Sequence, residues 1–342
     1  MRFYNIFFSP TGGTKKVADI VAKGTKLEAE KIDLIKEPDK LMKVKFEKKD
    51  LCLVAVPSYG GRIPSVVTDM FRKVKADGTK AILVAVFGNR MIDDTLLELQ
   101  DVLEASGFVC IAGMEAVAEH SLMHQFGTGR PDQQDEKELL EFAAKIMQNS
   151  EAQRTPAFPG NRPYREYGGV PLKPVANGTC TSCGLCAKEC PAGAIPLNNP
   201  KLTDKDKCIS CMHCVAVCPK KARNCSKFIS FIAGKKMKKV CSGRKETNCT
   251  YKSKVTGGEF MNMMFDLIFP VMFLLIFGMI LFAFISGIRT WNKNNNSPPF
   301  NGGSQGGCQA TEYDTSQRAG WRRHFRNSRV SYYHQHLLLC YF

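Results

Sequence analysis

Several signals of common function classes are missing from this 342-residue sequence. It has no G-x-x-x-x-G-K-[ST] motif, which excludes a P-loop nucleoside triphosphatase, and no G-x-G-x-x-G motif, which weakens any dinucleotide interpretation. Residues 1–4 lack the basic and apolar regions of a secretory signal peptide. We therefore expect a reducing compartment, in which thiols do not pair as disulfides.

Acidic residues are scarce in one half of the chain only. The net charge is +16, from 48 Lys and Arg against 32 Asp and Glu. Residues 1–150 hold 21 basic and 22 acidic residues, whereas residues 151–342 hold 27 and 10. The hydrophobic content of 44% is that of a globular protein, and the length suits roughly two domains. A near-neutral domain is thus joined to a strongly basic half.

Short apolar runs alternate with amphipathic stretches over residues 1–150. The runs predict buried parallel strands, and the stretches between them have helical spacing. The expected strands cover 3–8, 27–35, 51–56, 81–87 and 108–112. The expected helices cover 14–23, 64–75, 93–106 and 132–148. This alternation predicts an α/β fold with a doubly wound, five-stranded parallel sheet.

A loop rich in hydroxyl groups and glycine follows the first strand. It consists of Ser9, Pro10, Thr11, Gly12, Gly13 and Thr14. The glycines let the backbone approach an anion, the hydroxyl groups can donate to phosphate oxygens, and the following helix adds favourable potential. The loop therefore predicts a phosphate site.

The pattern S-x-T-G-x-T resembles the FMN phosphate loop of flavodoxins, with a complete match at Ser9, Thr11, Gly12 and Thr14. The resemblance implies a flavodoxin-like fold whose flavin ring lies between two further loops, with Tyr59 stacking on it. The first loop is Pro57, Ser58, Tyr59, Gly60 and Gly61; the second is Phe87, Gly88 and Asn89. All three loops would share the carboxyl edge of the sheet. The alternative is three ordinary turns.

Eight of the fifteen cysteines form two runs, each C-x-x-C-x-x-C-x-x-x-C-P. This is the spacing of bacterial ferredoxins, in which the fourth cysteine ligates the other of two [4Fe–4S] clusters. It predicts one cluster on Cys180, Cys183, Cys186 and Cys218. It predicts a second cluster on Cys208, Cys211, Cys214 and Cys190. Structural zinc and a disulfide framework are the weaker alternatives.

Other candidate residues receive modest roles. His213, inside the second run, is expected to be a surface residue or a cluster neighbour. His120 and His124 follow the fifth strand and are expected at the surface, the alternative being that they approach the flavin. Cys52 and Cys110 fall in strands and are expected in the core.

Residues 1–245 resemble the fused flavodoxin–ferredoxin proteins of anaerobes. The expected organisation is a flavodoxin-like FMN domain (1–150), a Pro/Gly linker (151–177), a 2[4Fe–4S] ferredoxin domain (178–225), a basic stretch (226–258) and a tail of low order (289–342). No nucleic acid is expected at the basic stretch, which lacks interleaved aromatic residues.

Residues 267–288 form the one long uncharged apolar run. At 1.5 Å per residue, a helix of this length crosses a hydrocarbon layer of about 30 Å. More Lys and Arg precede the run than follow it, which predicts redox domains on the cytoplasmic side of the inner membrane. Residues 261–299 resemble the start of an uncharacterised single-span bacterial membrane protein. The alternative is a frame-shifted tail and a cytoplasmic protein.

FMN holds one or two electrons and each cluster accepts one, so this combination predicts an electron-transfer protein with a redox partner protein. No general base or nucleophile is evident. Two alternatives stay open: a flavin-dependent reductase of a small acceptor, and a membrane-tethered redox sensor or assembly subunit.

Overall fold

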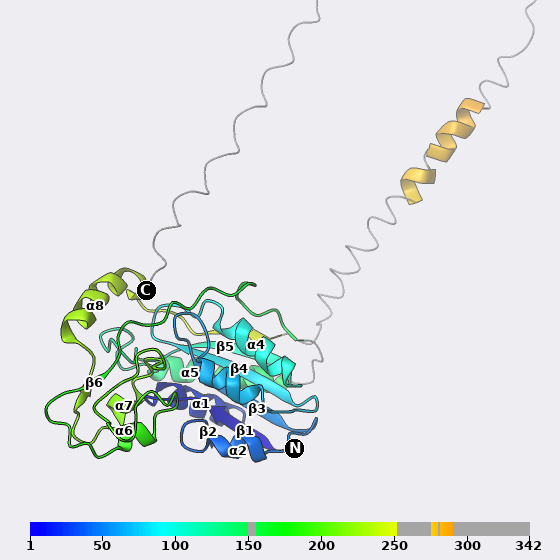
Figure 1. Cartoon of the computed structure of the whole chain (residues 1–342). Helices are drawn as coiled ribbons and strands as arrows, with labels where there is room; N and C mark the ends of the chain where they lie inside the picture. Colours follow the sequence, from blue (N-terminus) through cyan, green and yellow to red (C-terminus); the bar gives the residue numbers. More distant parts are fainter. Residues whose placement is uncertain (150–154, 252–274, 280, 290–342) are drawn as a thin grey trace, which may run out of the picture. The chain divides into compact units, whose positions relative to one another are not determined.

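The computed structural model describes residues 1–149, 155–251, 275–279 and 281–289. Its main sheet has the strand order β2-β1-β3-β4-β5-β8. The first five strands are parallel (Figure 1), and they are β1 Phe3–Phe7, β2 Ala29–Asp33, β3 Leu51–Pro57, β4 Lys80–Phe87 and β5 Val109–Val117. The order 2-1-3-4-5 is that of a flavodoxin-like doubly wound sheet. The predicted parallel sheet is therefore confirmed.

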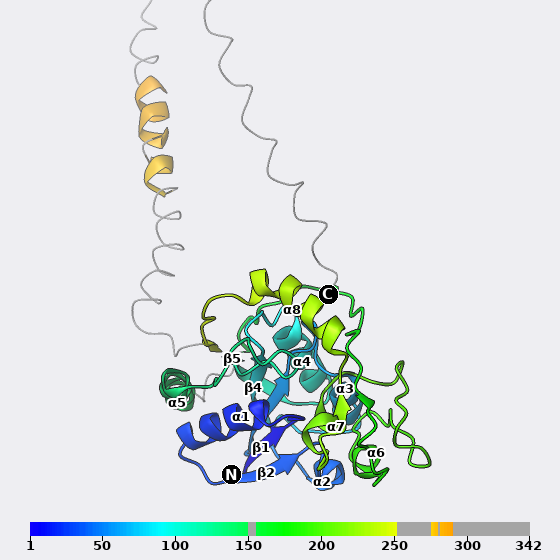
Figure 2. The ribbon, with the colours of Figure 1, turned by 90° about the vertical axis from the view of Figure 1, so that its left-hand side faces the viewer.

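Helices cover both faces of the sheet, as Figure 2 shows. α1 (Gly13–Gly24) and α5 (Gln133–Gln148) pack on one face through Val17, Val21 and Leu139. The other face carries α2 (Pro38–Lys43), α3 (Ser65–Phe71) and α4 (Thr95–Ala105). The strands are apolar on both sides because both faces are covered.

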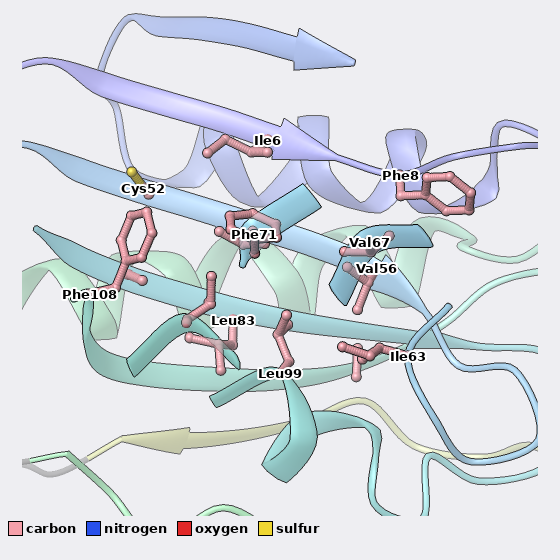
Figure 3. Close-up of a cluster of buried hydrophobic side chains, with 14 of the residues drawn as sticks. Ile6, Phe8, Cys52, Val56, Ile63, Val67, Phe71, Leu83, Leu99 and Phe108 are labelled. Carbon is pink, nitrogen blue, oxygen red and sulfur yellow. The ribbon is translucent and has the colours of Figure 1, made fainter. Parts of the chain in front are cut away.

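The hydrophobic core cluster on the second face of the sheet includes Ile6, Phe71, Leu83 and Phe108 (Figure 3). Cys52 belongs to it and is drawn there; Cys110 is also a member, and both side chains are fully buried. The expectation that these two cysteines are core residues is confirmed. Burial raises the pKa of both thiols, so they stay protonated at neutral pH.

The sheet has six strands where the sequence predicts five. β8 (Asn248–Tyr251) pairs antiparallel with β5, in the register Ala112 to Tyr251 and Glu115 to Asn248. It lies within the stretch that the sequence indicates only as basic. The chain thus returns to the first sheet after the cysteine runs, and the segment around 241–251 packs with the first 150 residues.

The predicted linker is also part of the packed structure. Phe158 lies in the core, and the Asn161 and Arg165 N–H groups donate to the Asp94 carboxylate at 2.8 and 2.7 Å. The Arg62 guanidinium donates to the Arg165 carbonyl at 2.7 Å. Residues 158–165 therefore form a strap over the start of α4.

The cysteine runs fold into short elements beside the sheet. These are β6 Val175–Ala176, α6 Leu185–Lys188, α7 His213–Ala216 and β7 Arg223–Asn224, with β6 and β7 paired antiparallel. α8 (Lys227–Cys241) follows, with Phe228 and Phe231 exposed.

Residues 275–279 and 281–289 are helical. No helix within the part of the chain that the structure describes is long and apolar enough to span a bilayer. Residues 267–274 and 280 of the predicted span lie outside the described residues, as do residues 290–342 of the predicted tail.

Candidate redox-cofactor site

The predicted phosphate loop lies between β1 and α1. α1 begins after Gly12, whose φ is 94° and which, as glycine, has no side chain to cap the helix. The Ser9 hydroxyl accepts from the Lys15 N–H at 2.8 Å. Thr14 is buried. The Ser9 hydroxyl takes the Lys15 N–H, and the N–H groups of Gly13 and Thr14 at the start of α1 can face an anion, so the loop fits the phosphate of FMN.

The loop after β3 is a tight turn. The Tyr59 N–H donates to the Arg62 carbonyl at 2.9 Å, and the Arg62 N–H donates to the Tyr59 carbonyl at 3.1 Å. Gly60 and Gly61 occupy the corner with φ of 59° and 86°, values that favour glycine. A Cβ on Gly61 would also lie 2.2 Å from an Asp93 carboxylate oxygen. Glycine at these two positions therefore has a conformational basis, and at Gly61 a steric one as well.

The Ser58 hydroxyl of this loop points into the protein and lies 2.7 Å from the Thr95 hydroxyl. Pro57 is the last residue of β3 and is buried. The side chains of these two residues therefore belong to the packing beneath the loop, and any flavin contact from them comes from their backbone.

The third predicted loop follows β4. The Phe87 side chain is buried in the core, and Gly88 lies against the His120 ring. The Asn89 amide donates to the carbonyls of Cys241 and Gly243 at 2.7 and 2.8 Å. The Asn89 side chain therefore fixes the segment between α8 and β8, a role that the sequence did not suggest.

The eight cysteines of the runs line two cavities. Cys180, Cys183, Cys186 and Cys218 line the first cavity. Cys190, Cys208, Cys211 and Cys214 line the second. In the described residues no three His, Cys, Asp or Glu side chains converge as around one metal ion. In a four-iron cluster each thiolate binds a different iron.

Backbone N–H groups already point at two of these sulfurs. Ala194 donates to Cys190 Sγ at 3.3 Å, and Ala222 donates to Cys218 Sγ at 3.2 Å. Such donors stabilise thiolates. Although burial acts to raise it, the pKa of Cys218 is lowered by the backbone N–H groups of Ala222, Lys220 and Arg223. Both cavities therefore fit a cluster ligated by four thiolates.

Two thiols of the second cavity are deeply buried. Burial raises the pKa of Cys211 to about 12 and that of Cys214 to about 11. Both are protonated at neutral pH without a metal, so metal binding there must release protons.

The second cysteine run contacts the phosphate loop directly. His213 is 6% exposed, and its Nδ1 donates to the Pro10 carbonyl at 2.8 Å. Its Nε2 lies 3.1 Å from the Glu189 carboxylate. The expectation of a surface residue is wrong: His213 joins the two parts of the molecule.

The loop after β3 meets the same run. Ile209 and Tyr59 both pack against the core cluster of the main sheet. Tyr59 is partly buried, and its pKa is raised well above 10 by burial, with contributions from Cys211 and Tyr167. A Cβ on Gly60 would lie 3.0 Å from the Tyr167 ring. Two predicted flavin loops and the second cavity thus converge on one region.

Sequence analysis missed Arg223 and underrated His120, whereas the surface position expected for His124 is confirmed. His120 is partly buried, which lowers its pKa to about 4, whereas His124 is exposed beside Glu119. Arg223 is fully buried and lines the first cavity. Its only signal in the sequence is an arginine where the first run has Ile195, five residues after the last cysteine.

Residues 179–223 match the family model described as a 4Fe-4S dicluster domain. A 55-residue stretch is 46% identical to one component of the ion-translocating oxidoreductase complex of Methanosarcina acetivorans. That alignment covers 16% of this chain and 21% of the relative, so the chain spans about a fifth of the relative's length.

Two flavodoxin structures are similar to the first part of the chain. Flavodoxin 1 from Bacillus cereus has a TM-score of 0.33 at 17% identity and covers 43% of this chain and 98% of its own. Megasphaera elsdenii flavodoxin has a TM-score of 0.29 at 21% identity, with 42% and 99% covered. The fold assignment itself rests on the strand order. The chain therefore joins a flavodoxin-like sheet to a 4Fe-4S dicluster domain at residues 179–223.

Proposed function

We propose that this protein relays electrons between FMN, held at the carboxyl edge of the main sheet, and two [4Fe–4S] clusters held by the two cysteine cavities. FMN exchanges one or two electrons and each cluster exchanges one, so two clusters match the capacity of one flavin. The proposed ligands are the four cysteines that line each cavity.

One observation carries the proposal: the second cysteine run lies on the predicted phosphate loop. The hydrogen bond of 2.8 Å from His213 to Pro10 joins a residue beside Cys214 to the loop that would hold the FMN phosphate. Tyr59 of the adjacent loop and Ile209 of the second run pack against the same core cluster. A chain that merely fused two independent carriers would not need this contact.

The contacts also favour an order of sites. The cluster on Cys190, Cys208, Cys211 and Cys214 would be adjacent to the flavin, and the cluster on the first cavity would follow. Cys183, in the first cavity, is exposed. We infer that a redox partner protein exchanges electrons at this exposed end.

The chain's own residues would position and insulate the cofactors. Backbone N–H groups of Ala194 and Ala222 would stabilise ligand sulfurs, and the turn at Gly60 and Gly61 would bring its backbone toward the flavin ring. Ile209 and Tyr59 would exclude water between the flavin and the nearer cluster.

The test is anaerobic purification with quantification of cofactors. We expect about eight irons, about eight acid-labile sulfides and about one FMN per chain. Reduction of FMN by a chemical donor should be followed by the EPR signal of reduced [4Fe–4S] clusters. A protein with about eight irons and no flavin would refute the relay but leave the dicluster domain. A protein without iron would refute both.

Membrane attachment through residues 267–288 stays a proposal of the same kind. Full-length protein and a variant that ends at Tyr251, the last residue of β8, should be compared by membrane flotation. We expect flotation of the full chain alone. Equal behaviour of the two would exclude the anchor.

A further inference from the structure

Arg223 is the least expected side chain of the dicluster domain. It is 1% exposed, and no ion pair of the described residues includes it. Removing a guanidinium from water without a negative partner costs several kcal/mol, so a buried arginine is normally paired with a carboxylate. The position therefore requires a source of negative charge.

The contacts of Arg223 are to neutral acceptors. Nη1 donates to the Pro200 carbonyl at 2.7 Å; Nη2 donates to the Pro174 carbonyl at 3.2 Å and to the Thr203 hydroxyl. Nε is buried without a partner. The carbonyls fix the orientation of the guanidinium, but none of them carries the charge that would balance it.

Arg223 contacts a group of packed side chains that includes cysteines of both cavities. Nη1 lies 3.7 Å from Cys186 Sγ, which belongs to the first cavity, and Arg223 itself lines that cavity. Cys186 belongs to the same buried group of side chains as Cys214, which lines the second cavity. The guanidinium therefore lies beside the point at which ligands of the two proposed clusters pack together.

We propose that Arg223 is the common counter-charge of the two [4Fe–4S] clusters and holds both of their reduction potentials up. The inference rests on the proposed function. An electron that arrives on either cluster adds negative charge beside the guanidinium, so the positive charge favours the reduced form of each. The thiolates and the clusters in turn supply the negative charge that burial of Arg223 requires.

The proposal separates Arg223 from the lysines nearby. Lys220 also lines the first cavity, but its side chain is exposed, and water and salt screen its charge. Lys220 should therefore have little influence on either cluster, although it lies in the same loop and carries the same formal charge.

The experiment is an EPR-monitored redox titration of the full holoprotein with R223Q, R223K and K220Q. In R223Q we expect the reduction equilibrium constant of each cluster to fall roughly tenfold or more, which is about 59 mV per tenfold for one electron. In R223K we expect at least half of that shift to be recovered. In K220Q both clusters should stay within about twofold of the parent.

The outcomes separate this inference from the proposed function, which the parent's iron and flavin content tests. The proposal is overturned if R223Q holds about eight irons and its cluster potentials are unchanged. It is also overturned if the potential of only one cluster shifts in R223Q, or if the potentials shift as far in R223K as in R223Q. If R223Q loads no iron, R223K decides. If R223K binds iron and its cluster potentials are near those of the parent, the result supports a requirement for positive charge at this position. Failure of both variants to load shows a packing role and overturns the proposal.

Discussion

The exchange of the fourth cysteine between the runs can be tested by pairs of substitutions. Cys218 lines the cavity of Cys183, whereas Cys190 lines the other one. C183A/C218A therefore removes two ligands from one cluster and leaves the second intact. C183A/C190A removes one ligand from each cluster. We expect about four irons and an intact [4Fe–4S] EPR signal in C183A/C218A, and no intact four-iron cluster in C183A/C190A.

Ligation within each run would give the reverse result. C183A/C190A would then keep one cluster, and C183A/C218A would keep none. The assay is iron and sulfide per chain with EPR of the reduced protein, purified without oxygen. C249A is the matched control, because Cys249 lines neither cavity, and it should retain about eight irons. An intact cluster in C183A/C190A would refute the exchanged assignment.

Three further predictions concern the frame around the site. Asp135 is fully buried and forms ion pairs with Arg130 and Arg244, so D135A should lower the free energy of unfolding, measured in urea, by about 3–5 kcal/mol. The control is E136A, which removes the exposed ion pair of Glu136 with Lys23 and should cost at most ~1 kcal/mol. Burial lowers the pKa of His120 to about 4, so its contribution to stability is complete above about pH 6.5 and is lost as the pH falls toward 4. Over this pH range the free energy of unfolding should fall by about 3 kcal/mol less in H120Q than in the parent. Parallel curves of unfolding free energy against pH for the two proteins would contradict this. N89A should accelerate hydrogen exchange across 241–251, because two carbonyls there lose their donor; unchanged exchange would show that β8 pairing alone holds the segment.

The predicted strands are close to the observed ones wherever an apolar run ends at a turn residue. The predicted ends of β1 and β3 lie within one residue of the observed ends. β5 extends to Val117, five residues beyond the prediction, because Gly113 and Glu115 interrupt the apolar pattern. Both Met114 and Ala116 are nonetheless buried. In the sequence, the change from a continuous apolar run to alternating apolar and other residues thus looks like the end of the strand, although β5 continues.

The elements that sequence analysis missed depend on long-range contacts. β8 has the sequence Asn-Cys-Thr-Tyr, which shows no apolar run, and it is a strand because β5 offers an open edge. The strap at 158–165 is rich in proline and glycine like a linker, but its backbone N–H groups find the Asp94 carboxylate. The spacing predicts two sets of four cysteines, and the two cavities are lined by the same sets; their ligation of clusters stays a prediction. It could not reveal which of them faces the flavin loops.

That orientation follows from how the two runs differ within a shared backbone. Ser182 and Ser210 both have φ of 55°, and Gly184 and Met212 both adopt the left-handed region at φ of 78° and 65°. The two runs are therefore copies of one conformation.

Two positions break this repeat. His213 stands where the first run has Leu185, and its bond to Pro10 directs the second run toward the phosphate loop. Arg223 stands where the first run has Ile195, and it places a cation at the first cavity, 3.7 Å from Cys186 Sγ. A symmetric dicluster domain could accept electrons at either end. With a histidine that fixes one end to the main sheet, and with the thiol of Cys183 exposed in the other cavity, the same backbone acquires a near and a far site. In the proposed relay, the direction of electron transfer would thus arise from substitutions at equivalent positions, with no change in the proposed ligands themselves.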